Sequence, residues 1–140
     1  MRVEPYLTLS GRCEEALAFY NQAIGAKTTM LMRFDESPDK SHPMPLPPNW
    51  GKKILHSAMT VGDTTVMLSD GMSTEAVSFA GVSLSITADN EAQVKKIFDA
   101  LSVGGKVFMP PGKTFWSPYF GMTSDKFGVS WMVGVDGDGE

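Results

Sequence analysis

Residues 54–69 read ILHSAMTVGDTTVMLS, which is two β-rich runs separated by the pair Gly62-Asp63. Valine, isoleucine and threonine favour strands, and glycine supplies the positive φ that a tight hairpin turn needs. The stretch therefore predicts a β-hairpin with strands over residues 54–61 and 64–69.

The residues before this hairpin predict a strand, a helix and a further strand. Leu7 and Leu9 alternate with polar residues, as expected of a short strand. Between Cys13 and Ile24 the apolar residues fall on one helical face, and Gly25 is a suitable stop. A strand over 28–34 follows, so the first half of the chain has the order βαβββ.

The second half repeats that order. Val82, Leu84 and Ile86 alternate with polar residues, and Asn90 with Gln93 resembles a capping box that opens a helix. The apolar face of this helix comprises Val94, Ile97, Phe98 and Leu101. Three β-like runs follow, at 106–109, 119–123 and 129–135. The sequence thus predicts an α+β fold of paired βαβββ modules, whose curled mixed sheets surround a cleft, the default ligand site.

We expect a single domain over residues 1–140, with module one at about 1–75 and module two at about 76–140. Residues 35–53 carry five prolines, which forbid regular strand pairing. We therefore expect a long loop there, acting as a lid or as a partner arm. Pro110-Pro111-Gly112 predicts a shorter turn.

Composition excludes several classes of function. The formal net charge is −4 and the lysines form isolated pairs, so there is no basic stripe to follow phosphates and nucleic acid is not expected as a partner. No apolar run has the length of a signal peptide or a membrane span, so we expect a cytoplasmic protein with no membrane partner. Cys13, the only cysteine, cannot form an intramolecular disulfide and is expected to be buried on its helix.

Strand alternation over residues 129–135 predicts which side chains pack and which meet a ligand. The apolar odd positions are Val129, Trp131, Val133 and Val135. Because successive side chains point to opposite faces of a strand, these residues should pack under a helix. Met132 is then expected to face the cleft.

The same alternation applies to the hairpin. Its expected core positions are Leu55, Met59, Val61, Val66 and Leu68. His56, Met67 and Ser69 are then expected to face the cleft, because successive side chains of a strand point to opposite faces. An imidazole there could act as a general base or as a hydrogen-bond donor; a structural histidine in a half-buried strand is the alternative.

Residues 115–121 are rich in aromatic side chains just before a strand. Trp116 and Tyr119 would suit stacking against a planar or apolar ligand; core packing or a dimer contact is equally open. Further on, residues 125–128 predict a turn in which Asp125 bonds local backbone and Gly128 relieves strain.

Several of these segments resemble a known group. Residues 15–20, followed by Ile24-Gly25, are similar to the first-helix signature of the vicinal-oxygen-chelate superfamily, which has the glyoxalase/bleomycin resistance/dioxygenase fold. Over nearly the whole chain the sequence resembles the PhnB-like branch. The motifs that carry this resemblance are Pro5-Tyr6-Leu7, Cys13-Glu14-Glu15-Ala16, Ser69-Asp70, Phe115-Trp116 and Asp125-Lys126-Phe127-Gly128-Val129-Ser130-Trp131-Met132.

The resemblance implies homodimers and a divalent metal held by His, Glu or Gln. The corresponding positions here are Met132, a position at or near Met67, one near Gly81, and Pro5 or Glu4. Thioethers suit soft metals, so we expect no metal in that position and no cofactor. Some PhnB-like proteins are labelled methyltransferases, but this chain lacks the glycine-rich turn of nucleotide-like cofactor sites.

The leading hypothesis is a PhnB-like protein of unknown substrate that binds a small molecule in a dimeric cleft without the usual metal. The expected ligand-binding residues are His56, Met67, Ser69, Trp116, Tyr119 and Met132, with His56 the best catalytic candidate. One alternative is a divalent-metal-dependent lyase, isomerase or dioxygenase with relocated ligands Glu4, His56 and Asp70. The other is a drug-sequestering dimer without chemistry, as in bleomycin resistance.

Overall fold

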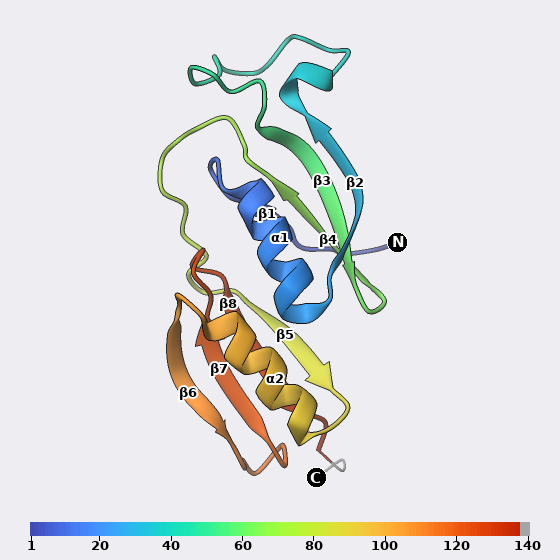
Figure 1. Ribbon diagram of the computed structural model, residues 1–140, viewed down its shortest axis with the longest axis vertical. Coiled ribbons are helices and arrows are strands. Elements are labelled where there is room, and N and C mark those ends of the chain that lie inside the picture. Colours follow the sequence, from blue (N-terminus) through green and yellow to red (C-terminus); the bar gives the residue numbers. More distant parts are fainter. Residues whose placement is uncertain (138–140) are drawn as a thin grey trace. The chain divides into compact units, whose positions relative to one another are not determined.

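A computed structural model of the protein describes residues 1–137, and the chain divides into two compact units, Met1–Val77 and Ser78–Glu140. Each unit has one four-stranded mixed sheet and one helix (Figure 1). Both follow the order βαβββ in curled sheets that do not close, which confirms the predicted fold class. That the units together form one domain stays a prediction.

Unit 1 contains the predicted hairpin. Its elements are β1 (Tyr6–Thr8), α1 (Cys13–Ile24), β2 (Lys27–Arg33), the 3-10 turn η1 (Phe34–Glu36), β3 (Ile54–Val61) and β4 (Thr64–Ser69). The strand order is β1-β4-β3-β2, with β1 parallel to β4 and the other pairs antiparallel. Gly62 has φ +56, so the turn residue adopts the conformation for which glycine was expected.

Helix α1 lies on its sheet through the predicted apolar stripe. Its buried residues are Cys13, Ala16, Leu17 and Tyr20. The helix ends at Gly25, whose left-handed φ of 68° is the usual conformation after a helix C-terminus. Glu14 and Glu15 occupy the first turn, where the helix dipole favours carboxylates.

Unit 2 repeats the arrangement. Its elements are β5 (Ser83–Ala88), α2 (Glu91–Ser102), β6 (Lys106–Gly112), β7 (Phe120–Ser124) and β8 (Ser130–Val135). The strand order is β5-β8-β7-β6, with β5 parallel to β8. Val82, which the alternating pattern included in this strand, precedes β5 and is 64% exposed.

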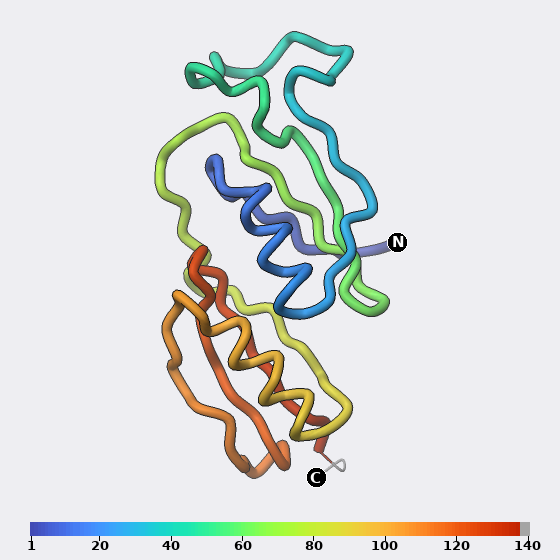
Figure 2. The backbone as a smooth tube through the Cα atoms, viewed as in Figure 1, coloured from blue at the N-terminus to red at the C-terminus, as the bar shows by residue number. Residues whose placement is uncertain are grey.

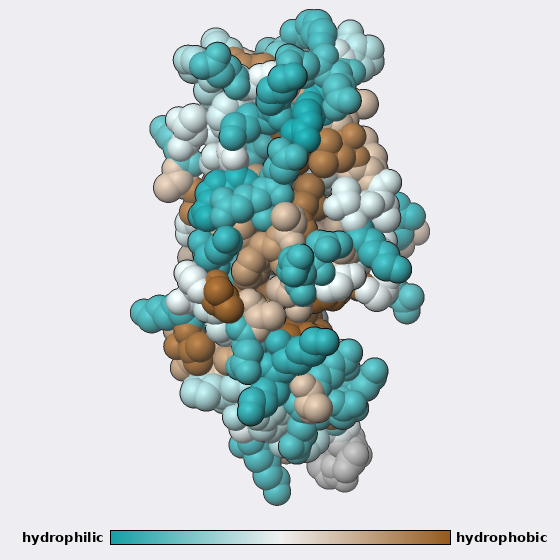
Figure 3. Space-filling model, viewed as in Figure 1, coloured by the Kyte–Doolittle hydropathy of each residue, from teal (hydrophilic) through white to brown (hydrophobic). Residues whose placement is uncertain are grey.

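Helix α2 begins with a variant of the predicted capping box. The Asn90 side chain accepts from the Gln93 N–H at 2.9 Å, but the Gln93 side chain accepts from the N–H of Asp89 rather than that of Asn90. Its buried face comprises Val94, Phe98 and Leu101. Figure 3 shows hydrophilic side chains over the outer surface of α2, as expected of an amphipathic helix on a sheet.

Strand β6 overturns the turn predicted at Pro110-Pro111-Gly112. These residues belong to the strand, which pairs only with β7 and so forms one edge of its sheet. Neither proline has a ladder partner, because the register of β6 with β7 passes from Met109 to Gly112, so their missing N–H groups remove no paired hydrogen bond. The pairing shifts register between Val107 and Met109 and again between Met109 and Gly112.

The proline-rich segment between β2 and β3 has η1 as its regular element and otherwise runs as a long loop (Figure 2). Its C-terminal end is fixed by Trp50, which is buried and donates from Nε1 to the Gly71 carbonyl at 2.8 Å. At the other end, Asp35 donates its N–H to the Gly51 carbonyl. A role as lid or partner arm stays a prediction. No helix within residues 1–137 has both the length and the hydropathy to cross a membrane.

Candidate functional site

In unit 1, one face of the sheet packs against α1 and the other is turned away from it. The Cys13 sulfur of α1 lies 3.6 Å from the Ser57 hydroxyl, which places the Ser57 side of β3 under the helix. Paired residues in adjacent strands share a face. The opposite face therefore carries Tyr6, Met67, Ala58 and Met30, one from each strand in register. We call this the open face of unit 1.

His56 lies on this open face, beside Tyr6. The Tyr6 hydroxyl and His56 Nδ1 share a hydrogen bond of 3.1 Å, and the two rings stack with centroids 5.6 Å apart at an interplanar angle of 25°. His56 is half-buried and pairs with Met32 of β2. Because Nδ1 is engaged by Tyr6, the ring is oriented and Nε2 is the atom available for exchange with a ligand.

Met67 and Ser69 share the open face by alternation, but their surroundings differ. Met67 is half-buried, in the row with Tyr6. Ser69 is buried, and its hydroxyl donates to the Leu55 carbonyl at 2.7 Å and accepts from the Gly71 N–H at 2.9 Å. The Ser69 hydroxyl thus holds the ends of β3 and β4 together.

The start of β3 departs from the predicted alternation. Leu55, expected on the core side, is half-buried, whereas its neighbour Ile54 is fully buried. The cause is an irregularity in the pairing of β2 with β3, between Met32 and Arg33, which displaces the two-residue repeat.

Asp70 is buried at the end of β4 with both carboxylate oxygens engaged. Oδ1 accepts from the Cys13 N–H at 2.8 Å, and Oδ2 accepts from the Ile54 N–H at 2.7 Å. Glu4, the second residue of the proposed relocated set, pairs with Arg2 at 3.4 Å. Residues 1–137 contain no group of three or more His, Cys, Asp or Glu side chains that could hold a metal ion.

The positions at which the resemblance implies metal ligands do not fit a hard divalent ion. Met67 and Met132 present thioethers, Gly81 has no side chain, and the fourth position is Pro5, which has no side-chain donor, or Glu4, so at most one of the four is a carboxylate. Ions such as zinc or iron in catalytic sites need about three nitrogen, oxygen or thiolate ligands from the protein. No step of a mechanism is therefore derived through a metal.

Cys13 is the buried residue that the sequence predicted. Burial raises its thiol pKa to about 12, against the opposing effect of the hydrogen bond with Ser57. A thiol in this state is protonated at neutral pH and is not a nucleophile.

Unit 2 also has an open face. A side chain at Gly121 would collide with the Phe98 ring of α2, so Gly121 lies under the helix and its neighbours Phe120 and Met122 point away. The row across the strands is Ser85, Met132, Met122 and Met109. Met132 is half-buried on this face, while Trp131 and Val133 are buried on the helix side.

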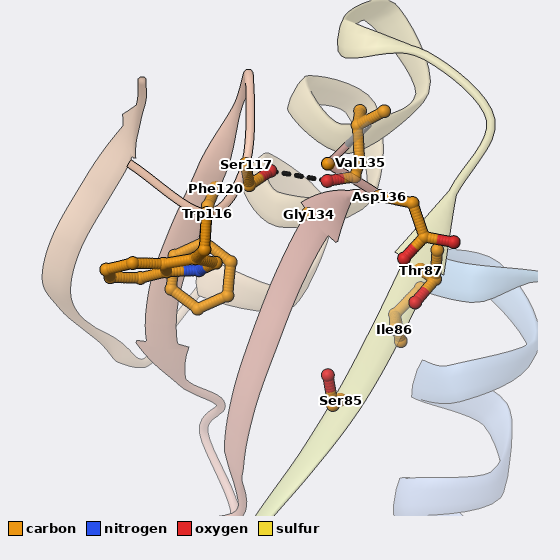
Figure 4. A pocket seen from close by; sticks show the side chains of 10 residues that line it. Ser85, Ile86, Thr87, Trp116, Ser117, Phe120, Gly134, Val135 and Asp136 are labelled. Atoms are coloured by element: carbon orange, nitrogen blue, oxygen red, sulfur yellow. Dashed lines mark hydrogen bonds between the residues drawn. The ribbon is translucent and has the colours of Figure 1, made fainter. Parts of the chain in front are cut away.

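A pocket of about 160 Å³ opens at one end of this face (Figure 4). The Phe120 ring lies over Gly134, where a Cβ would come within 2.7 Å of it. Trp116 packs edge-on against Phe120 with centroids 5.4 Å apart, and Phe115 packs in the same way against Trp116. The aromatic segment thus forms a wall of the pocket.

The segment before β7 is held by Ser117, whose hydroxyl donates to the Val135 carbonyl (Figure 4). Tyr119 lies outside the pocket; it is half-buried, and its carbonyl accepts from the Val135 N–H at 3.0 Å. Of the two expected aromatic contacts, only Trp116 lines the pocket.

The Asp125 turn has the structural role that the sequence predicted. Its Oδ1 accepts from the N–H groups of Phe127 and Val129, and its Oδ2 accepts from the Trp131 indole at 2.8 Å. Gly128 has φ +87, a conformation that other residues rarely adopt.

Three residues of these faces were missed by sequence reasoning, namely Tyr6, Phe120 and Asp136. Tyr6 could have been found, since it alternates with Leu7 on the first strand. Phe120 was part of the aromatic segment, but no face of the sheet was predicted for its side chain. Asp136 follows the last strand, and nothing in the sequence linked it to Trp116.

A family model described as 3-demethylubiquinone-9 3-methyltransferase matches residues 1–134. The chain is 32% identical over 140 residues to protein YjdN of Escherichia coli (strain K12), a match that covers 96% of this chain and 95% of that protein. Among solved structures, protein PA1353 from Pseudomonas aeruginosa is 37% identical with a TM-score of 0.85, and 99% of each chain is covered.

Two further solved structures define the wider group. The PhnB protein from Bacillus cereus is 26% identical with a TM-score of 0.79, covering 96% of this chain and 99% of that one. A glyoxylase/bleomycin resistance protein/dioxygenase domain from Frankia sp. EAN1pec is 11% identical with a TM-score of 0.65, covering 97% of each chain. The last likeness concerns the fold alone.

Proposed function

The chain belongs to the family described as 3-demethylubiquinone-9 3-methyltransferase, the PhnB-like branch of the glyoxalase/bleomycin resistance/dioxygenase superfamily. From that premise we propose that it binds a small molecule on the open faces of its sheets. We propose further that it does so as a homodimer and without a divalent metal.

The observation that carries this proposal is the pair of Tyr6 and His56. Small-molecule sites combine an apolar lining with a few oriented polar groups. His56 is half-buried and oriented through Nδ1 by the Tyr6 hydroxyl, and Met67 and Met30 line the same face. Methionine adapts its shape to a ligand and makes favourable contacts with aromatic rings.

We assign His56 the role of hydrogen-bond partner, or of general base where the ligand has an acidic proton. Met67 would contact the ligand in unit 1, and Trp116 and Met132 in unit 2. Tyr119, which lies outside the pocket, would act through its backbone, since its carbonyl accepts from the Val135 N–H. Ser69 would act through the backbone that it fixes, because its hydroxyl is already engaged.

The proposal that no divalent metal takes part is supported by the donor chemistry. Met67 and Met132 have thioether side chains. Asp70 follows Ser69 in the sequence, and both of its carboxylate oxygens already accept from backbone N–H groups. The methyltransferase name is not extended to this chain. Its two strand-to-helix connections, residues 9–12 and 89–90, hold a single glycine, Gly11, unlike the glycine-rich turns that hold nucleotide-like cofactors.

A thermal-shift screen with a chemically diverse small-molecule library, followed by calorimetric titration of the best binder, tests the binding function. We expect His56→Ala to weaken that binder about ten-fold, which is about 1.4 kcal/mol, without lowering the melting temperature. His42→Ala is the matched control, since His42 is the other histidine and lies in the loop between β2 and β3. Equal affinity in His56→Ala would remove His56 from the site, and a library without any binder would contradict the proposal.

Metal content and assembly are measured on the same protein. Purification without chelator, followed by elemental analysis, should give far less than one divalent ion per chain, and a stoichiometric ion would overturn the metal-free proposal. Light scattering after size exclusion should give the mass of a dimer. Localisation to the cytoplasm is proposed from the sequence and is tested by cell fractionation.

A further inference from the structure

We propose that the pocket in unit 2 selects a small aromatic molecule that carries a positive charge, such as an arylalkylamine. The inference rests on the proposed function, because it names the ligand class for one of the two open faces.

The aromatic wall presents an indole that is available to a ligand. Trp116 is 44% exposed, whereas Trp50 and Trp131 are only 5% and 3% exposed. Phe120 supports the Trp116 ring edge-on, and Ser117 fixes the segment that carries it. Phe115 also contacts the indole in a T-shaped geometry, so the exposed part of the Trp116 ring is what a second ring or a cation could meet.

Gly134 shapes the floor of the pocket. Thr87 of β5 is paired with Gly134 of β8, which in turn is paired with Phe120 of β7. Because Gly134 has no side chain, the Phe120 ring lies over it, where a Cβ would come within 2.7 Å of the ring. The floor beside Thr87 is therefore aromatic, and a flat ligand could pack against it.

The opposite wall is polar. Figure 4 shows the side chains of Thr87 and Asp136 together on one side of the pocket, across from the rings of Trp116 and Phe120, and the Ser85 hydroxyl further along β5. Two hydroxyls and a carboxylate are acceptors for an ammonium group.

Asp136 is the one charged side chain among the described residues that line this pocket. The local potential is therefore negative, which disfavours a carboxylate ligand and favours an ammonium. Lys113 lines a neighbouring hollow, which shares Trp116, Ser117 and Gly137 with this pocket, but it is not among the residues that line the pocket itself.

The pocket volume limits ligand size. At about 160 Å³ it is smaller than the pockets that hold drug-sized molecules, which run from about 300 Å³ upward. It suits one aromatic ring with a short charged arm.

Tryptophan fluorescence of the full chain provides the test, because Trp116 is the exposed indole. The probes are 2-phenylethylamine, 2-phenylethanol and phenylacetate, which share a phenyl ring and differ in charge. At low salt we expect the amine to bind about five-fold more tightly than the alcohol, and phenylacetate to bind most weakly. The preference for the amine should shrink at high salt, because Asp136 is exposed and its charge is screened.

Two variants test whether Trp116 and Asp136 cause the fluorescence response and the preference for the amine. Trp116→Leu should abolish the fluorescence response, and Asp136→Asn should bring the amine to the affinity of the alcohol. Asp99→Asn on the outer surface of α2 is the matched control and should retain the five-fold preference. Circular dichroism of each variant confirms that the fold is intact before titration.

Equal affinity for amine and alcohol in the native chain, or an unchanged preference in Asp136→Asn, would overturn the inference. If none of the three probes binds while the library screen yields a binder that depends on His56, the inference fails and the proposed function stands. If neither the probes nor the library binds, both fail.

Discussion

The carboxylate of Asp70 accepts the N–H of Cys13 at 2.8 Å, across 57 residues of sequence. Cys13 is the first residue of α1, whose own N-cap residue, Arg12, makes no side-chain capping bond. Asp70 therefore caps the helix from the end of β4, and its second oxygen accepts from Ile54 at the start of β3. One buried carboxylate thus joins three elements of unit 1.

Asp70→Asn should destabilise the protein strongly. The amide replaces one accepting oxygen with an NH₂ group, which cannot accept from a backbone N–H. We expect the free energy of unfolding to fall by about 2–3 kcal/mol, the range for a lost hydrogen bond to a charged group. Urea unfolding followed by circular dichroism measures it. Asp99→Asn, the same change on an exposed helix surface, should shift the midpoint little.

Trp131→Phe should cost more stability than Trp50→Phe. Both indoles are buried and donate at 2.8 Å, but Trp131 donates to the Asp125 carboxylate and Trp50 to the Gly71 carbonyl. A hydrogen bond to a charged acceptor is worth about 1 kcal/mol more than one to a neutral acceptor. Urea midpoints of the two variants test this order, and a larger loss in Trp50→Phe would contradict it.

Cys13 should make the protein sensitive to alkali. Its pKa rises from 9.0 to about 12 on burial, so the folded state keeps the proton after the unfolded state has lost it. The free energy of unfolding should then fall as pH rises above 9. Between about pH 8.5 and 10.5 we expect the native chain to lose about 1–2 kcal/mol more than Cys13→Ala. Parallel slopes in the two proteins would show that the thiol does not contribute.

Gly134→Ala should disturb the pocket in unit 2. The new methyl group would lie 2.7 Å from the Phe120 ring, which must move and take Trp116 with it. We expect a loss of about 1–3 kcal/mol from overpacking, together with a shift of the Trp116 emission. Gly112→Ala is the control, because its nearest neighbour would be 4.0 Å away. An unchanged Gly134→Ala variant would mean that the ring adapts freely.

Local patterns predicted most of the fold. The hairpin around Gly62, the end of α1 at Gly25 and the Asn90 cap all depend on residues within a few positions of one another. Pro110 was misplaced because a proline stops a strand only where its N–H is needed, and whether β6 lies at an edge is decided by the order of the whole sheet.

The candidate site was predictable only in part, for a related reason. Alternation of apolar and polar residues was enough to predict that His56 and Met132 point away from the helices. That Tyr6 meets His56 depends on the parallel pairing of β1 with β4, which joins residues far apart in sequence. Ser69 has the expected direction, but its burial follows from hydrogen bonds to Leu55 and Gly71 that no periodicity encodes.

Pro110 and Pro111 on the outer strand β6 have a consequence for the protein at high concentration. An edge strand with a full row of N–H groups is a template on which another chain can add a strand and begin a fibril. Two adjacent residues without that donor interrupt the template. The outer edge of β6 should therefore resist amyloid growth, even though Val107 and Phe108 of the same strand are apolar and exposed.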